Sequence, residues 1–167
     1  MNYDKMIEEI TLLCEDCPYP LANLSNTIAV IFNTLPDINW AGVYFSEGDV
    51  LSLGVFQGKV ACTEIPFSRG VCGAAAREMR TQRVDDVHKF PGHIACDAAS
   101  RSEIVIPIIS DGELVGVLDI DSPRLSRFDE EDERGLSIIA DHIAQCLSSS
   151  RKHSQYLAAK DMGSSPA

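Results

Sequence analysis

The sequence lacks any long apolar run. No stretch approaches the roughly 20 consecutive apolar residues that a membrane-spanning helix requires. The first ten residues are acidic and amphipathic, without the basic start and apolar stretch of a secretory signal. These absences argue against an integral membrane protein and a secreted one, and we expect a soluble protein that stays in the cytoplasm.

Positive charge is also scarce. The chain has 14 Lys and Arg against 25 Asp and Glu, so its formal net charge is −11. An acidic surface repels phosphate backbones and anionic lipid headgroups, and no basic stripe interrupts it. We therefore expect neither nucleic acid nor a membrane as a partner, whereas an acidic site would suit a substrate that carries an amino group.

Internal repeats and domain linkers are absent, and 167 residues suffice for one core. We expect a single domain over residues 1–150 and a disordered polar tail over residues 151–167. Apolar spacing and composition predict helices near residues 6–14, 21–32, 70–80 and 128–149. Alternation and turn residues predict strands near residues 39–45, 50–56, 60–65, 102–109 and 113–121. This order predicts an α+β fold, with an antiparallel sheet covered on one face by the terminal helices.

Six cysteines are many for a cytoplasmic chain of this size. Structural disulfides are rare in that compartment, so such cysteines are buried apolar residues, metal ligands or redox groups. Cys14 and Cys17 have CxxC spacing, but no second CxxC follows and no βαβ pattern surrounds them, so we assign them no role. Cys146 falls on the apolar stripe of the last helix, where a core position is expected.

The other three cysteines have stronger functional interpretations. Cys96 lies in a stretch without periodicity, beside His93, and long loops in compact domains are often functional. An accessible, reactive thiol is one interpretation and an incidental loop cysteine is the other. Cys72 begins a predicted helix, where the helix dipole lowers a thiol pKa, although tight packing would also favour a small residue there. Cys62, on a predicted strand, would by itself be a core residue.

Acidic residues occur in an apolar strand, where Asp is disfavoured. Asp119 and Asp121 are two residues apart and share one strand face, and Glu103 begins the partner strand. A strand-end turn also accounts for Asp121. If the three converge, burial and like charge raise their pKa values, so one carboxyl stays protonated near pH 7 while another binds an ammonium group.

Trp40, Gly42 and Tyr44 share one face of the first predicted strand. An aromatic, glycine, aromatic series leaves a concavity suited to a small apolar group. Ordinary core packing is the other interpretation, and the residues alone favour it.

Taken together, these segments resemble the free methionine-(R)-sulfoxide reductases, a family built on the GAF domain. The likeness spans residues 39–143 and is carried by segments 39–44, 56–62, 67–73, 90–97, 116–123 and 128–132. Generic GAF sensors lack this cysteine triplet. The resemblance implies a GAF fold, with an antiparallel sheet of about six strands, flanking N- and C-terminal helices, and a small closed pocket.

The resemblance also implies an activity, the thioredoxin-dependent reduction of free L-methionine (R)-sulfoxide. In that family's mechanism Cys96 would attack the sulfoxide sulfur, release methionine and become a sulfenic acid. Cys62 would condense with it to a disulfide, with Cys72 as an auxiliary or alternative resolving thiol. The helix argument ranks Cys72 as the most acidified thiol, but we follow the resemblance because attack also depends on placement opposite the substrate.

Binding roles follow from the same resemblance. Trp40 and Tyr44 would hold the S-methyl end of the substrate. Glu103, Asp119 and Asp121 would bind its amino group and assist protonation of the sulfoxide oxygen. We expect no bound cofactor and no metal, and we expect the thioredoxin and NADPH system as the external reductant.

Two alternatives stay open. Related GAF domains sense small molecules without chemistry, and a metal-binding domain could use Cys62, Cys72, Cys96 and His93, although their spacing is unlike that of a zinc finger. A homodimer is favoured only by analogy with isolated GAF domains.

Overall fold

The computed structural model describes residues 1–92 and 98–162, the last of these (149–162) as backbone only. Cys96 and His93 therefore lie outside the described residues. The described elements, in chain order, are α1 (Tyr3–Cys14), α2 (Pro20–Thr34), β1 (Trp40–Glu47), β2 (Val50–Gly58), β3 (Glu64–Pro66), α3 (Gly70–Glu78), β4 (Gln82–Val84), the 3₁₀ helix η1 (Val87–Lys89), β5 (Ser102–Ser110), β6 (Glu113–Ser122) and α4 (Glu130–Met162).

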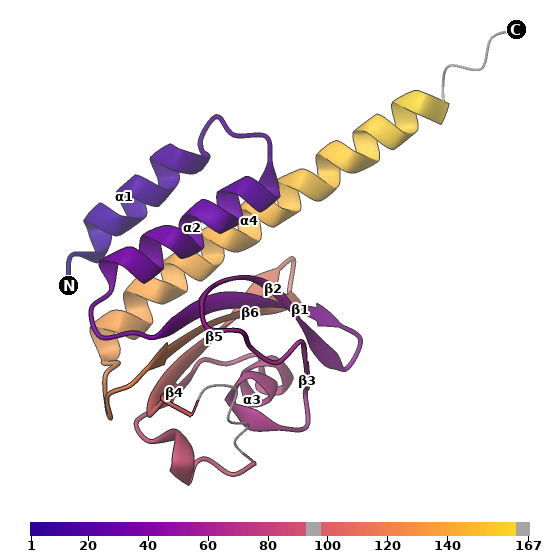
Figure 1. Ribbon diagram of the computed structural model, residues 1–167. Helices are drawn as coiled ribbons and strands as arrows, with labels where there is room; N and C mark the ends of the chain where they lie inside the picture. The colour runs from indigo at the N-terminus through magenta and orange to yellow at the C-terminus, as the bar shows by residue number, and fades with distance from the viewer. Residues whose placement is uncertain (93–97, 163–167) are drawn as a thin grey trace, which may run out of the picture.

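The described strands form one antiparallel sheet in the order β3-β2-β1-β6-β5-β4. The α+β class and the sheet of about six strands are confirmed. Helices α1, α2 and α4 stack on one face of this sheet, and α3 lies against the other, as Figure 1 shows. The terminal helices thus cover one face, as the sequence order predicts.

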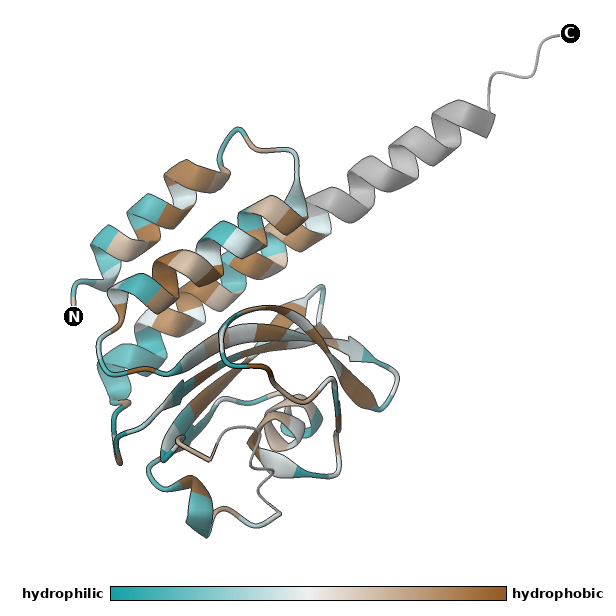
Figure 2. Cartoon of the chain, in the orientation of Figure 1, coloured by the Kyte–Doolittle hydropathy of each residue, from teal (hydrophilic) through white to brown (hydrophobic). Residues whose placement is uncertain are grey.

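Strand alternation separates two cores. Ala41 and Val43 of β1 join the core under the terminal helices, whereas Trp40 and Tyr44 join the smaller core under α3. Because successive strand residues point to opposite faces, the same rule assigns the odd-numbered positions 103–107 of β5 and 117–121 of β6 to the α3 face. The register shift between Ile108 and Ile109 changes the alternation, and Val115 joins the core under the terminal helices. Apolar residues follow the strands in Figure 2, and teal and brown alternate along α1 and α2, as expected for amphipathic helices.

Some elements differ from the prediction. Strand β4 and the 3₁₀ helix lie in a region where neither was expected, because three-residue elements are too short to show a period. Helix α4 continues to Met162, where a disordered tail was expected from residue 151. Residues 151–162 contain Gln, Leu, Ala and Lys, all good helix formers, and no glycine or proline before residue 163.

Across residues 1–92 and 98–162, no helix combines the length and apolarity that crossing a bilayer requires.

Candidate active site

A thiol and two carboxyls lie together on the α3 face of the sheet. Cys72 of α3, Glu103 of β5 and Asp119 of β6 are 4%, 6% and 5% exposed. One donor atom from each lies within 4.8 Å of the others. The Cys72 thiol donates a hydrogen bond to Oε1 of Glu103, with the sulfur 3.7 Å from that oxygen. Residues far apart in the sequence thus form one buried polar cluster.

Strand register brings the carboxyls together. Glu103 of β5 is paired with Asp121 of β6, and Val105 is paired with Asp119. Glu103 and Asp119 are therefore diagonal neighbours on one face, close enough for their side chains to interact. On the helix side, a Cβ at Gly73 would lie 2.7 Å from the carbonyl oxygen of Pro66. Glycine at this position lets the first turn of α3, and with it Cys72, pack closely.

The two carboxyls have different proton affinities. Burial raises the pKa of Glu103 well above its ordinary value, and the negative charges of Asp119 and Asp121 raise it further. Burial also raises the pKa of Asp119, to about 6, against the opposing effect of hydrogen bonds from Cys72 and Glu103. At pH 7 Asp119 is therefore mostly ionised, whereas Glu103 holds its proton more tightly than an ordinary glutamate does. The pair can thus serve as a proton donor beside a carboxylate.

The prediction of an acidified Cys72 was wrong. Burial raises the pKa of the Cys72 thiol well above its ordinary value, and the charges of Asp119 and Glu103 add to that effect. The helix dipole is outweighed because the thiol is desolvated beside carboxyls, while Arg69 at the N-cap is exposed to solvent. Cys72 is therefore a neutral hydrogen-bond donor at pH 7.

Stacked aromatic side chains lie beside this cluster. The Trp40 indole stacks on Tyr44, with ring centroids 5.8 Å apart, and on Phe56, at 5.4 Å. A Cβ at Gly42 would lie 2.8 Å from Cζ3 of Trp40 and 2.6 Å from Cβ of Phe56. The indole covers the space above Gly42, so the structure here agrees with ordinary core packing and not with a concavity. Sequence reasoning missed Phe56, although the pairing of its strand with β1 places it opposite Gly42.

Both aromatic side chains of β1 also hold the chain segment before β3. Tyr44 donates a hydrogen bond to the carbonyl of Cys62 at 3.1 Å, and Trp40 donates one to the carbonyl of Lys59 at 3.1 Å. Burial, followed by the charge of Asp119, raises the pKa of the Tyr44 phenol, which therefore remains a donor. The backbone of Cys62 is thus anchored beside the acidic cluster.

The cysteines that the structure describes differ in oxidation state. Cys62 is half-buried and disulfide-bonded. Cys14, Cys17, Cys72 and Cys146 are free thiols. A cysteine that already forms a disulfide offers no thiolate to a metal, so this state of Cys62 does not fit the alternative of a Cys/His metal-binding domain.

The cluster could instead hold a cation through Cys72, Glu103 and Asp119. One soft sulfur and two hard oxygens form a mixed donor set. Oδ1 of Asp119 is buried without a hydrogen-bond partner among the described atoms. Because buried acceptors are nearly always paired, this oxygen marks a position for a hydrogen-bond donor, and an ammonium group supplies such donors.

Comparison with known proteins identifies the fold and the family. The model of the GAF domain matches residues 22–148. The free methionine-R-sulfoxide reductase of Escherichia coli K12 is 54% identical over 127 residues, which cover 76% of this chain and 77% of that protein. The enzyme of the same name from Saccharomyces cerevisiae is 45% identical over 152 residues, covering 84% of each chain.

A solved structure agrees over nearly the whole chain. The free methionine-R-sulfoxide reductase of Neisseria meningitidis, determined in complex with its substrate, superimposes with a TM-score of 0.87 at 42% identity. The match covers 90% of this chain and 91% of the Neisseria chain. The protein described here therefore belongs to the free methionine-R-sulfoxide reductase family of GAF-domain proteins.

Proposed function

We propose that this protein is an oxidoreductase that reduces free methionine-R-sulfoxide to methionine. The names of the Escherichia coli and Saccharomyces relatives support the reaction. The observation that carries the proposal is the buried pair of Glu103 and Asp119, in which burial raises the pKa of Glu103 well above its ordinary value and that of Asp119 to about 6. This difference makes Glu103 the proton donor and Asp119 the carboxylate. Reduction of a sulfoxide needs such a proton donor, and a free amino acid brings the ammonium group that the carboxylate can bind.

The substrate would contact both the acidic cluster and the aromatic side chains beside it. We assign the amino group to Asp119, whose Oδ1 has no other hydrogen-bond partner among the described atoms, with Asp121 adding negative charge nearby. The S-methyl end is assigned to the aromatic side, at Trp40 and Tyr44. Their stacking gives a rigid apolar surface that contacts a methyl group without requiring a polar partner.

The chemistry we propose begins at Cys96, which lies outside the described residues. Its sulfur attacks the sulfoxide sulfur while Glu103 protonates the oxygen. The oxygen then passes to Cys96 as a sulfenic acid and methionine leaves, so the substrate sulfur gains two electrons and Cys96 loses two. The thiol of Cys62 next displaces water from the sulfenic acid to form a disulfide, which the dithiol of thioredoxin reduces.

The states of Cys62 and Cys72 support this division of roles. Cys62 is disulfide-bonded, whereas Cys72 is a free and neutral thiol that donates to Glu103. A protonated thiol is a poor nucleophile, so Cys62 is the preferred resolving cysteine and Cys72 remains the auxiliary. In this assignment Cys72 positions the carboxyl of Glu103.

The decisive experiment measures NADPH consumption with thioredoxin, thioredoxin reductase and free methionine-R-sulfoxide. Turnover is expected with the free R form, and not with the S form or a sulfoxide in a peptide. No turnover by freshly reduced protein would overturn the proposal and favour a small-molecule sensor.

A further inference from the structure

A second sulfur cluster lies on the opposite side of the sheet, among the terminal helices. Cys14 ends α1, and His142 and Cys146 lie four residues apart on α4. One donor atom from each of the three lies within 4.8 Å of the others. Cys14 is buried, and the other two are half-buried. Residues at i and i+4 share a helix face, so the imidazole of His142 and the thiol of Cys146 lie on the same side of α4.

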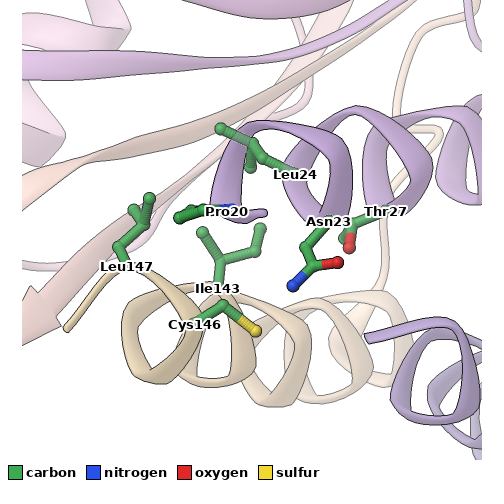
Figure 3. A pocket seen from close by; sticks show the side chains of 7 residues that line it. All are labelled: Pro20, Asn23, Leu24, Thr27, Ile143, Cys146 and Leu147. Carbon is green, nitrogen blue, oxygen red and sulfur yellow. The ribbon is translucent and has the colours of Figure 1, made fainter. Parts of the chain in front are cut away.

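Polar atoms near this cluster lack partners. Nε2 of His142 and Oδ1 of Asn23 are buried without a hydrogen bond to any described atom. Asn23 and Thr27 line a cleft between α2 and α4 together with Cys146, and Figure 3 shows the Cys146 sulfur on the side of α4 that faces them. Oγ1 of Thr27 also lies 4.0 Å from the Cys14 sulfur. Buried polar atoms are usually paired, so an imidazole that has an unpaired ring nitrogen and clusters with two thiols points to a ligand that accepts lone pairs.

The donor set defines the ligand. Two thiols and an imidazole are the donors that zinc prefers, and three protein ligands with one open position are a common zinc arrangement. In a tetrahedral zinc site the donor atoms lie about 3.3–3.8 Å apart, so a small adjustment of side chains closes the present cluster around an ion. We propose that Cys14, His142 and Cys146 bind one divalent cation of the zinc class, with water in the fourth position.

Such an ion would tie the C-terminal end of α1 to α4 and so stabilise the packing of the terminal helices. It would do this on the face of the sheet opposite the candidate active site. The proposal does not depend on the reductase function, because none of its residues belongs to that site.

Cys17 provides a matched control. It is three residues from Cys14 and half-buried, but its thiol donates to the carbonyl of Tyr19 at 3.8 Å and is not part of the cluster. If the CxxC pair formed the site, Cys17 would lie with Cys14 in the cluster, but it lies outside it. Cys72 provides the control for the acidic cluster on the other face.

The test is titration of the fully reduced, metal-free protein with Co²⁺, followed by competition with Zn²⁺. We expect one equivalent of Co²⁺ to give the sulfur-to-cobalt charge-transfer band and the visible bands of a tetrahedral site, and Zn²⁺ to displace it. Cys146→Ser and His142→Gln should weaken binding more than about tenfold, since losing even an outer-shell partner of a ligand weakens binding roughly 10- to 100-fold. Cys17→Ser and Cys72→Ser should retain the signal.

Other outcomes would overturn the proposal. Loss of the signal in Cys72→Ser would move the ion to the acidic cluster, and loss in Cys17→Ser alone would move it to the CxxC pair. Absence of any tetrahedral signal, with a Cys14–Cys146 disulfide found by mass spectrometry after mild oxidation, would make the cluster a redox pair. Circular dichroism of each metal-free variant checks that the fold persists, and half-buried His142 is the substitution least expected to disturb it.

Discussion

The two sulfur clusters of this protein lie on opposite faces of one sheet and differ in their neighbours. On the α3 face, Cys72 meets the carboxyls of Glu103 and Asp119. On the face of the terminal helices, Cys14 and Cys146 meet the imidazole of His142. The residue type is the same in both places. Carboxyl neighbours keep a thiol protonated and favour proton transfer, whereas a second thiol and an imidazole favour a soft metal ion.

The comparison also shows why the position of a cysteine on a helix is a weak guide to the pKa of its thiol. Cys72 stands in the first turn of a helix, where the dipole favours a thiolate. Its pKa is nevertheless raised, because desolvation by burial and the adjacent negative charges outweigh the effect of the dipole. The chemistry of a cysteine here depends on the side chains that the fold brings to it.

The largest effect on activity is expected from removing the proposed nucleophile. Cys96→Ser should reduce turnover of free methionine-R-sulfoxide to background, because serine cannot form the sulfenic acid. The matched control Cys17→Ser removes a thiol that belongs to neither sulfur cluster and should leave turnover unchanged. The NADPH-coupled assay measures both, and substantial turnover by Cys96→Ser would remove this residue as the nucleophile.

Removing the resolving thiol should separate chemistry from recycling. Cys62→Ser is expected to release about one equivalent of methionine per protein and then to lose thioredoxin-driven turnover, because the sulfenic acid has no preferred thiol to condense with. Single-turnover release of methionine and the steady-state rate are measured on the same preparation. An unchanged steady-state rate would assign the resolving role elsewhere, with Cys72 as the next candidate.

Glu103→Gln tests the acid on the α3 face. Glutamine keeps the shape and can donate a hydrogen bond, but it cannot transfer a proton to the sulfoxide oxygen. We expect kcat to fall by roughly 10²-fold or more, the usual effect of losing a general acid. Cys72→Ser should have a smaller effect, since a hydroxyl can still donate to the carboxyl. Equal losses in the two variants would contradict the assignment of the proton to Glu103.

A smaller effect concerns stability and pH. Burial raises the pKa of Asp119 from an ordinary 3.8 to about 6, so the folded protein holds this proton more tightly than the unfolded chain does. Its contribution to stability is present in full below about pH 3.8 and is lost as the pH rises through about 6, amounting to about 3 kcal/mol at most. Asp119→Asn should remove this part of the pH dependence in urea unfolding between pH 4 and 7. An identical profile for the variant would show that Asp119 titrates normally.

Local patterns predicted much of the architecture. Alternating residues located β1, β2, β5 and β6 within two residues at each end, and helical spacing located the helices that cover one face. The same alternation placed Asp119 and Asp121 on one face, because strand geometry has a period of two wherever the strand lies. These features depend on neighbours in the chain, so they can be read from the sequence.

Such patterns did not predict the contacts between segments that are distant in the sequence. The end of α4 was missed because a polar segment without an apolar stripe gives no periodic signal even when its residues favour helix. The indole of Trp40 covers Gly42, where alternation alone suggested a concavity. No spacing rule connects Cys14 to Cys146, since packing of α1 on α4 is what brings them together.

The sequence by itself therefore determined the order of elements, the two faces of the sheet and the residue types that carry the chemistry. Only the tertiary structure decided which thiol is desolvated beside carboxyls, which carboxyls have raised pKa values and which cysteines lie beside an imidazole. The physical reason is that burial and electrostatic interactions depend on distance in space, and folding brings together side chains that the sequence keeps far apart.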